Sequence, residues 1–167
     1  ITGMLFFIAG SVKERYHTLE ISRLSGMLKQ MPRMGWIMGF CVMASLGLPG
    51  LAGFWGEFPA ILSAYQPAAG LSEVTFRIFM VIAAVGTVLA AGYLLWLFQR
   101  IAFGEPTAEF SGDSHDDHGS GIHDVNVFEW MAWAPLLAAI LVLGVYPNLL
   151  FKIIDPAVQG VLSAFGG

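Results

Sequence analysis

Uncharged stretches of helical length alternate with short charged segments along the chain. The uncharged stretches are residues 1–12, 34–66, 78–99 and 130–151, and Glu57 is the single charged residue inside them. An α-helix needs roughly 20 apolar residues to cross ~30 Å of hydrocarbon, and each of the last three stretches is long enough. The pattern therefore predicts an all-α polytopic membrane protein.

The first stretch is too short to span a membrane, and the chain opens on Ile rather than Met. We expect residues 1–12 to be the end of a truncated membrane helix, because a signal peptide would need a positive segment before it and a cleavage site after it. The other expected segments are a basic loop at 13–33, a discontinuous membrane helix at 34–66, membrane helices at 74–99 and 128–152, an acidic His-containing loop at 100–127 between these two, and an amphipathic tail at 153–167.

The composition fits this class. Charged residues make up 12% of the chain and hydrophobic residues 56%, whereas a soluble domain carries about 25% charged residues. Cys41 is the only cysteine, so no disulfide can form within the chain.

The basic residues predict the orientation. Five of the eight lie in the first connecting segment, which the positive-inside rule places in the cytoplasm: Lys13, Arg15, Arg23, Lys29 and Arg33. Alternate threading then puts residues 67–73 outside, the loop at 100–127 inside and the tail outside.

Two short segments have apolar residues at helical spacing. Thr18 can cap a turn that ends near Gly26, with apolar residues on one face. In the tail, Asp155 and Pro156 form an N-cap and first-turn pair before a second amphipathic run. Docking against neighbouring helices and resting in the membrane interface are both open for these segments.

The stretch at 34–66 contains helix-breaking residues in its middle, within the sequence SLGLPGLAGFWGEF. Pro49 cannot donate its backbone hydrogen bond, and Gly50 and Gly53 are free to take positive φ. As one helix the stretch would run about 50 Å and overshoot the bilayer. We therefore expect two half-helices with a break between Leu48 and Gly53, beside a polar cavity that satisfies the freed backbone groups.

Glu57 follows the predicted break within about one turn. The exposed amides at the start of a helix favour the carboxylate, whereas apolar surroundings favour the protonated acid. Ionisable side chains deep in a membrane usually mark ion or proton paths, so Glu57 is the candidate proton-transfer residue. The alternative is a glutamate that only caps a helix or pairs across a helix interface.

Several ordered motifs resemble one family of membrane subunits. GFWGEF at residues 53–58 resembles the region after the break in the twelfth helix of the M-type, antiporter-like subunit of NADH:quinone oxidoreductase (respiratory complex I). The segments KERYHT at 13–18, SGMLKQMP at 25–32 and FEWMAWAPLLAAILVLGVYPN at 128–148 resemble flanking motifs of that subunit. L-type and N-type relatives usually carry lysine near the position of Glu57.

The resemblance implies a fold of fourteen helices, of which this chain would hold the end of helix 11 and helices 12–14. It implies that Glu57 passes protons through a half-channel in a bacterial inner membrane, next to L-type and N-type subunits. FMN, iron–sulfur clusters and quinone would lie in other subunits, and no cofactor or metal is expected in this chain. The alternatives are a subunit of a multi-subunit cation/proton antiporter and a purely structural membrane subunit.

Residues 113–124 place His115, His118 and His123 among four aspartates. This composition could hold a soft divalent ion. The spacing matches no regular metal site, however, and glycine and serine are frequent, so a solvated loop is favoured. We expect a chain without this loop to assemble and pump.

Overall fold

The computed structural model describes residues 1–68, 70–110 and 122–165, and in this part of the chain every regular element is a helix. The elements are α1 (Thr2–Tyr16), α2 (Met27–Gln30), α3 (Pro32–Ser45), α4 (Ala52–Ser63), α5 (Glu73–Ala102), a 3-10 helix η1 (Ala108–Phe110), α6 (Val127–Val145) and α7 (Asn148–Phe165). The all-α prediction is confirmed.

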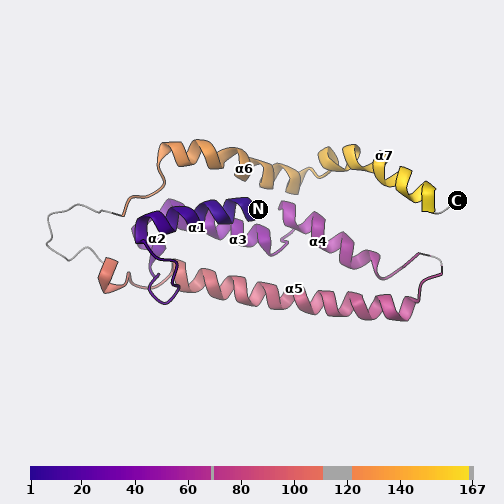
Figure 1. Ribbon diagram of the computed structural model, residues 1–167, viewed down its shortest axis with the longest axis horizontal. Coiled ribbons are helices and arrows are strands. Elements are labelled where there is room, and N and C mark those ends of the chain that lie inside the picture. The colour runs from indigo at the N-terminus through magenta and orange to yellow at the C-terminus, as the bar shows by residue number, and fades with distance from the viewer. Residues whose placement is uncertain (69, 111–121, 166–167) are drawn as a thin grey trace.

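The long helices lie along one common direction, so the molecule is elongated (Figure 1). Helices α3 and α4 follow one another along the middle of the molecule. Helix α5 runs beside them in the opposite direction, and α6 packs on α4 from the other side. Helix α1 packs against both α3 and α6, and α7 continues beyond α6.

Local capping explains where several helices start. Ser72 caps α5 by accepting a hydrogen bond from the Thr75 N–H through its hydroxyl oxygen. Asn126 and Glu129 form a capping box at the start of α6. The Asn126 side chain accepts from the backbone N–H of Glu129, and the Glu129 side chain accepts from the backbone N–H of Asn126. Pro32 is the first residue of α3, where its missing N–H costs nothing.

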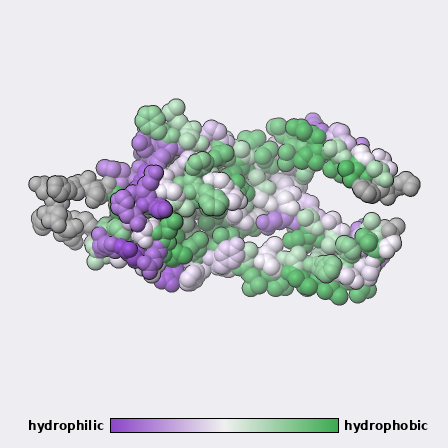
Figure 2. Space-filling view, in the orientation of Figure 1, coloured by the Kyte–Doolittle hydropathy of each residue, from purple (hydrophilic) through white to green (hydrophobic). Residues whose placement is uncertain are grey.

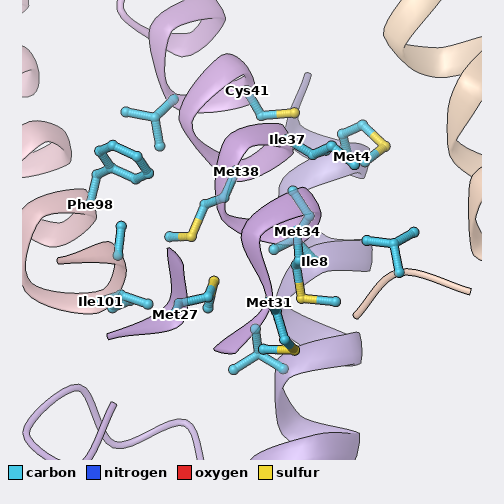
Figure 3. Packing of buried hydrophobic residues seen from close by; sticks show 14 of the residues in the cluster. Met4, Ile8, Met27, Met31, Met34, Ile37, Met38, Cys41, Phe98 and Ile101 are labelled. Atoms are coloured by element: carbon cyan, nitrogen blue, oxygen red, sulfur yellow. The ribbon is translucent and has the colours of Figure 1, made fainter. Parts of the chain in front are cut away.

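The buried core lies at one end of the bundle. Helix α1 contributes the apolar face formed by every fourth residue, namely Met4, Ile8, Val12 and Tyr16. Figure 3 shows Met34 and Met38 of α3 between Met4 and Ile8 of α1 on one side and Phe98 and Ile101 near the end of α5 on the other. The core therefore joins α1, α2 and α3 to the last turns of α5.

Hydrophilic residues gather at this same end of the molecule, and hydrophobic residues cover most of the other half (Figure 2). Among the described residues, two helices are long and apolar enough to cross a membrane, Glu73–Ala102 and Val127–Val145. None of the most apolar window of α5 is buried within this chain, and its exposed side chains include Ile82, Val88 and Leu89. This distribution is typical of helices that meet lipid or other membrane helices.

Helix ends differ from the expected ones at two places. Helix α1 continues to Tyr16, and residues 18–26 contain a turn at 21–23 in place of the helix expected after Thr18. The last apolar stretch divides at Tyr146 and Pro147, and the N–H groups of Leu150 and Phe151 donate to the Pro147 carbonyl at the start of α7.

The expected N-cap at Asp155 is wrong, because Asp155 and Pro156 lie inside α7. The helix already begins at Asn148, directly after Pro147, so Pro156 falls in its interior.

Candidate functional site between α3 and α4

Residues 46–51 form a non-helical connection between the end of α3 at Ser45 and the start of α4 at Ala52. Gly47 and Gly50 have φ values of 68° and 91°, in the left-handed region that side chains with a Cβ rarely adopt. Pro49 lies between these two glycines. Within this connection Leu46 still donates to the Val42 carbonyl, and Gly47 and Leu51 close short turns by donating to the carbonyls of Ala44 and Leu48.

The three residues that the sequence predicts to break the helix do not all lie in this connection. Pro49 and Gly50 lie in the connection, whereas Gly53 is the second residue of α4. Gly53 is required for a close approach, since a Cβ there would stand 2.1 Å from the Ala44 carbonyl oxygen. Sequence reasoning did not select Gly47, although its position two residues before Pro49 was a usable signal.

Glu57 is the sixth residue of α4, beyond the first turn. The field of the helix dipole falls off within the first turn. The start of α4 therefore stabilises the Glu57 carboxylate less than we expected from the sequence. The side chain instead folds back to the connection, where its Oε2 atom lies 3.0 Å from the position that a Cβ on Gly47 would take. Glu57 is exposed in this chain, and its carboxylate has no hydrogen bond or ion pair within the described residues.

Helix α6 ends against the same connection. A Cβ on Gly144 would stand 2.3 Å from the Gly50 carbonyl oxygen and 2.4 Å from Leu51 Cα, so only glycine permits this contact. The Trp55 indole Nε1 donates to the Gly144 carbonyl oxygen at 2.7 Å. The Trp55 ring also makes an edge contact with Phe151 of α7 at 6.0 Å between centroids.

A second polar cluster lies at the hydrophilic end of the molecule and joins α1 to α6. Arg15 Nη2 lies 2.7 Å from Glu129 Oε2, and Arg15 Nη1 lies 2.9 Å from Glu129 Oε1. The side chains are only 14% and 20% exposed, and the Ser11 hydroxyl also donates to Glu129. We call Arg15, Glu129 and Ser11 the α1–α6 clasp. Glu129 is the second residue of the membrane helix expected at 128–152, but the sequence does not indicate this partner.

Asp124 links the same region to α3. Its two carboxylate oxygens accept hydrogen bonds from the N–H groups of Arg33 and Met34, at 2.9 and 3.1 Å. These are the second and third residues of α3, whose N–H groups have no partner within the helix. The preceding residue, Met31, has no oxygen in its side chain, so Asp124 takes the role of the capping side chain.

Two further acidic residues at this end form ion pairs on the surface. Arg23 and Lys29 form ion pairs with Glu109 and Glu105, so these contacts join the 13–33 segment to the residues after α5. The hydrogen bond and the charge of Glu109 raise the pKa of Arg23. Both pairs are exposed and contribute little to stability.

The candidate histidine site falls mostly outside the described residues. His115 and His118 lie in the undescribed segment, and the His123 carbonyl accepts from Arg15 Nε. In the part of the chain that the structure describes, no group of three or more His, Cys, Asp or Glu side chains could hold a metal ion.

Long apolar helices, an interrupted helical path and a carboxylate folded against the interruption are features of membrane proteins that move ions. Residues 1–90 match the family described as NADH:quinone oxidoreductase/Mrp antiporter, transmembrane. The chain belongs to this family of membrane subunits.

Relatives within the family are similar over almost the whole chain. NADH-quinone oxidoreductase subunit M of Rhodobacter capsulatus is 37% identical over 99% of this chain and 29% of its own length. Subunit M of Mycobacterium tuberculosis is 36% identical over 99% of this chain and 27% of its own length. The chain thus spans less than a third of these relatives, and the resemblance to M-type subunits is confirmed.

A solved structure shows the same fold. The structure of respiratory complex I from Thermus thermophilus with bound NADH contains a chain that is 32% identical, with a TM-score of 0.77. The match covers 99% of this chain and 31% of that chain.

Proposed function

We propose that this chain is part of a proton-translocating membrane subunit of a bacterial NADH:quinone oxidoreductase, in which Glu57 takes up and releases protons. On this proposal α3 and α4 are the two halves of the interrupted twelfth helix of a fourteen-helix subunit, and α5 and α6 belong to the next two helices. The subunit lies in the bacterial inner membrane beside L-type and N-type subunits, and FMN, iron–sulfur clusters and quinone lie in other subunits. The names of the relatives support this class of complex.

The position of the Glu57 carboxylate against Gly47 carries the proposal. It brings the one acidic side chain of the long uncharged stretch to the place where the helical hydrogen-bond ladder is interrupted. The N–H groups of Leu48 and Gly50 have no hydrogen-bond partner within the described residues, and the Leu48 side chain is exposed. Unpaired amides at membrane depth are costly, so water or polar groups of the full subunit must meet them.

The chemistry then needs only a carboxyl group and water. The Glu57 carboxylate accepts a proton from water on one side and becomes a neutral acid, and it releases that proton to water on the other side. The turn at Gly47 and Gly50 supplies the polar gap beside it. No electron transfer takes place at Glu57, so this step is independent of the redox cofactors.

Replacement of Glu57 in the intact complex tests the proposal. Glu57→Gln keeps the shape but cannot carry a proton, so it should strongly reduce proton uptake into reconstituted vesicles per NADH oxidised. Glu57→Asp should retain part of the activity. Glu73→Gln is a matched control, because Glu73 is an exposed carboxylate at the start of α5. Normal pumping by an assembled Glu57→Gln complex would show that Glu57 has a structural role only.

The family description also includes Mrp antiporters, which makes exchange of a cation for protons the second candidate function. The relatives from R. capsulatus, M. tuberculosis and T. thermophilus are named as NADH-quinone oxidoreductase subunits, which favours the first. Purification of the native assembly separates the two. Flavin and iron–sulfur clusters should copurify with the chain, whereas sodium-dependent proton exchange without them would support the antiporter.

A further inference from the structure

The end of α6 packs closely against the start of α4. Gly144 is the second-last residue of α6, and the carbonyls of the last four helical residues lack partners within the helix. The Gly144 carbonyl is satisfied by the Trp55 indole N–H at 2.7 Å. In a membrane this bond matters more than on a wet surface, because no bulk water replaces it.

The same contact fixes the backbone of the connection. Gly144 packs on Gly50 and Leu51 so closely that a Cβ on it would overlap the Gly50 carbonyl oxygen. Helix α4 has no buried residue in this chain, and α6 is a principal packing partner of it. The Gly144 contact therefore limits the distance of α4 from α6, and the Trp55 hydrogen bond fixes which face of α4 points toward α6.

Rotation of α4 determines where Glu57 points. Trp55 and Glu57 are two residues apart, which in an α-helix places their side chains roughly 200° apart around the axis. Trp55 faces α6, so Glu57 faces the opposite way, toward Gly47. A change in the Trp55 contact would turn Glu57 away from the gap.

We propose that Trp55 and Gly144 are positioning residues for the proton step, and that the Trp55 hydrogen bond holds the Glu57 carboxyl against the connection at Gly47. This inference rests on the proposed function of Glu57 and adds the element that orients it. Trp55 itself carries no proton.

Trp55→Phe in the intact complex removes the N–H and keeps an aromatic ring. We expect an assembled complex with a several-fold loss of protons translocated per NADH oxidised. Trp36→Phe is the matched control, because Trp36 of α3 is 68% exposed and its indole N–H has no hydrogen-bond partner within the described residues. This control should pump normally.

A spectroscopic readout separates positioning from a general structural effect. The infrared carbonyl band of protonated Glu57 is identified as the band that disappears in Glu57→Gln. It should change frequency in Trp55→Phe and stay unchanged in Trp36→Phe, since its hydrogen-bonding surroundings change only in the former. An unchanged band together with normal pumping would overturn the inference, even when Glu57→Gln abolishes pumping and the proposed function stands.

An isosteric replacement covers the case in which Trp55→Phe does not assemble. Benzothienylalanine at position 55 has the shape of tryptophan but carries sulfur in place of the N–H. It should assemble, lose pumping several-fold and shift the Glu57 band. Failure of this variant to assemble would also overturn the inference, because the hydrogen bond would then be needed for the fold and not for the position of Glu57.

Discussion

The Glu57 carboxylate occupies the space that a side chain on Gly47 would need. Its Oε2 atom lies 3.0 Å from the ideal Cβ position of Gly47, and Gly47 has a φ of 68°. Two independent conditions thus require glycine at this position. One is the left-handed backbone of the connection, and the other is the presence of the carboxylate.

Alanine substitutions at the two left-handed glycines separate these conditions. Gly47→Ala adds backbone strain of about 1–2 kcal/mol and also pushes the Glu57 carboxylate away. Gly50→Ala adds similar strain, but a Cβ there has no atom within 4 Å. We expect both variants to lower the stability of the assembled complex to a similar degree, and Gly47→Ala alone to lose most of its proton pumping at matched assembly. Equal pumping in the two variants would contradict a specific contact between Gly47 and Glu57.

The location of this connection was predictable in part from the sequence. Pro49 and Gly50 interrupt the helix because of intrinsic backbone properties, which any sequence shows directly. The role of Gly53 was not predictable, because it depends on the close passage of the Ala44 carbonyl. The fold-back of Glu57 onto Gly47 depends on the angle between α3 and α4, which propensity does not determine.

The α1–α6 clasp provides a test of stability. Removing one member of a mostly buried ion pair leaves an uncompensated charge, at a cost of about 3–5 kcal/mol. Arg15→Met and Glu129→Gln should each destabilise the purified complex strongly, and the double variant should be less destabilised than the sum of the two. Arg77→Met is the control, because Arg77 and Glu73 form an exposed pair worth at most ~1 kcal/mol.

The thermal midpoint for release of this subunit from the complex, followed on native gels, measures the effect. Additive losses in the double variant would mean that Arg15 and Glu129 are not coupled. A loss from Arg77→Met as large as that from Arg15→Met would show that burial of the pair has no influence.

The contacts at the hydrophilic end were not predicted, because their partners are far apart in the sequence. Arg15 and Glu129 are 114 residues apart in the chain, and each lies next to an apolar run. Periodicity shows that both residues border a helix, but it does not show which helices become neighbours. The same holds for Asp124 and the start of α3, which are about 90 residues apart.

Asp124 caps α3 although it is distant in the sequence, so replacing Asp124 should destabilise the start of that helix. Asp124→Ala leaves the N–H groups of Arg33 and Met34 without their acceptor, and loss of a capping side chain costs about 0.5–2 kcal/mol. Asp124→Asn keeps one acceptor oxygen and should have a smaller effect. Backbone hydrogen exchange over residues 31–36 should be slowest in the wild type, faster in Asp124→Asn and fastest in Asp124→Ala. Asp155→Ala on the exposed α7 serves as a control, and unchanged exchange in Asp124→Ala would contradict the capping role.

The structure divides the histidine-rich segment into two parts that should respond differently to replacement. Residues 113–121 contain His115 and His118 and lie outside the described residues, whereas His123 and Asp124 make backbone and side-chain contacts to Arg15 and α3. Replacing residues 113–121 with a glycine–serine segment of equal length should therefore leave assembly, proton pumping and bound metal content unchanged. Extending the replacement through Asp124 should reduce assembly, because the cap of α3 is lost. Reduced assembly or loss of a bound divalent ion in the shorter replacement would show that the histidines form a structural metal site, and equal behaviour of the two replacements would show that Asp124 is dispensable.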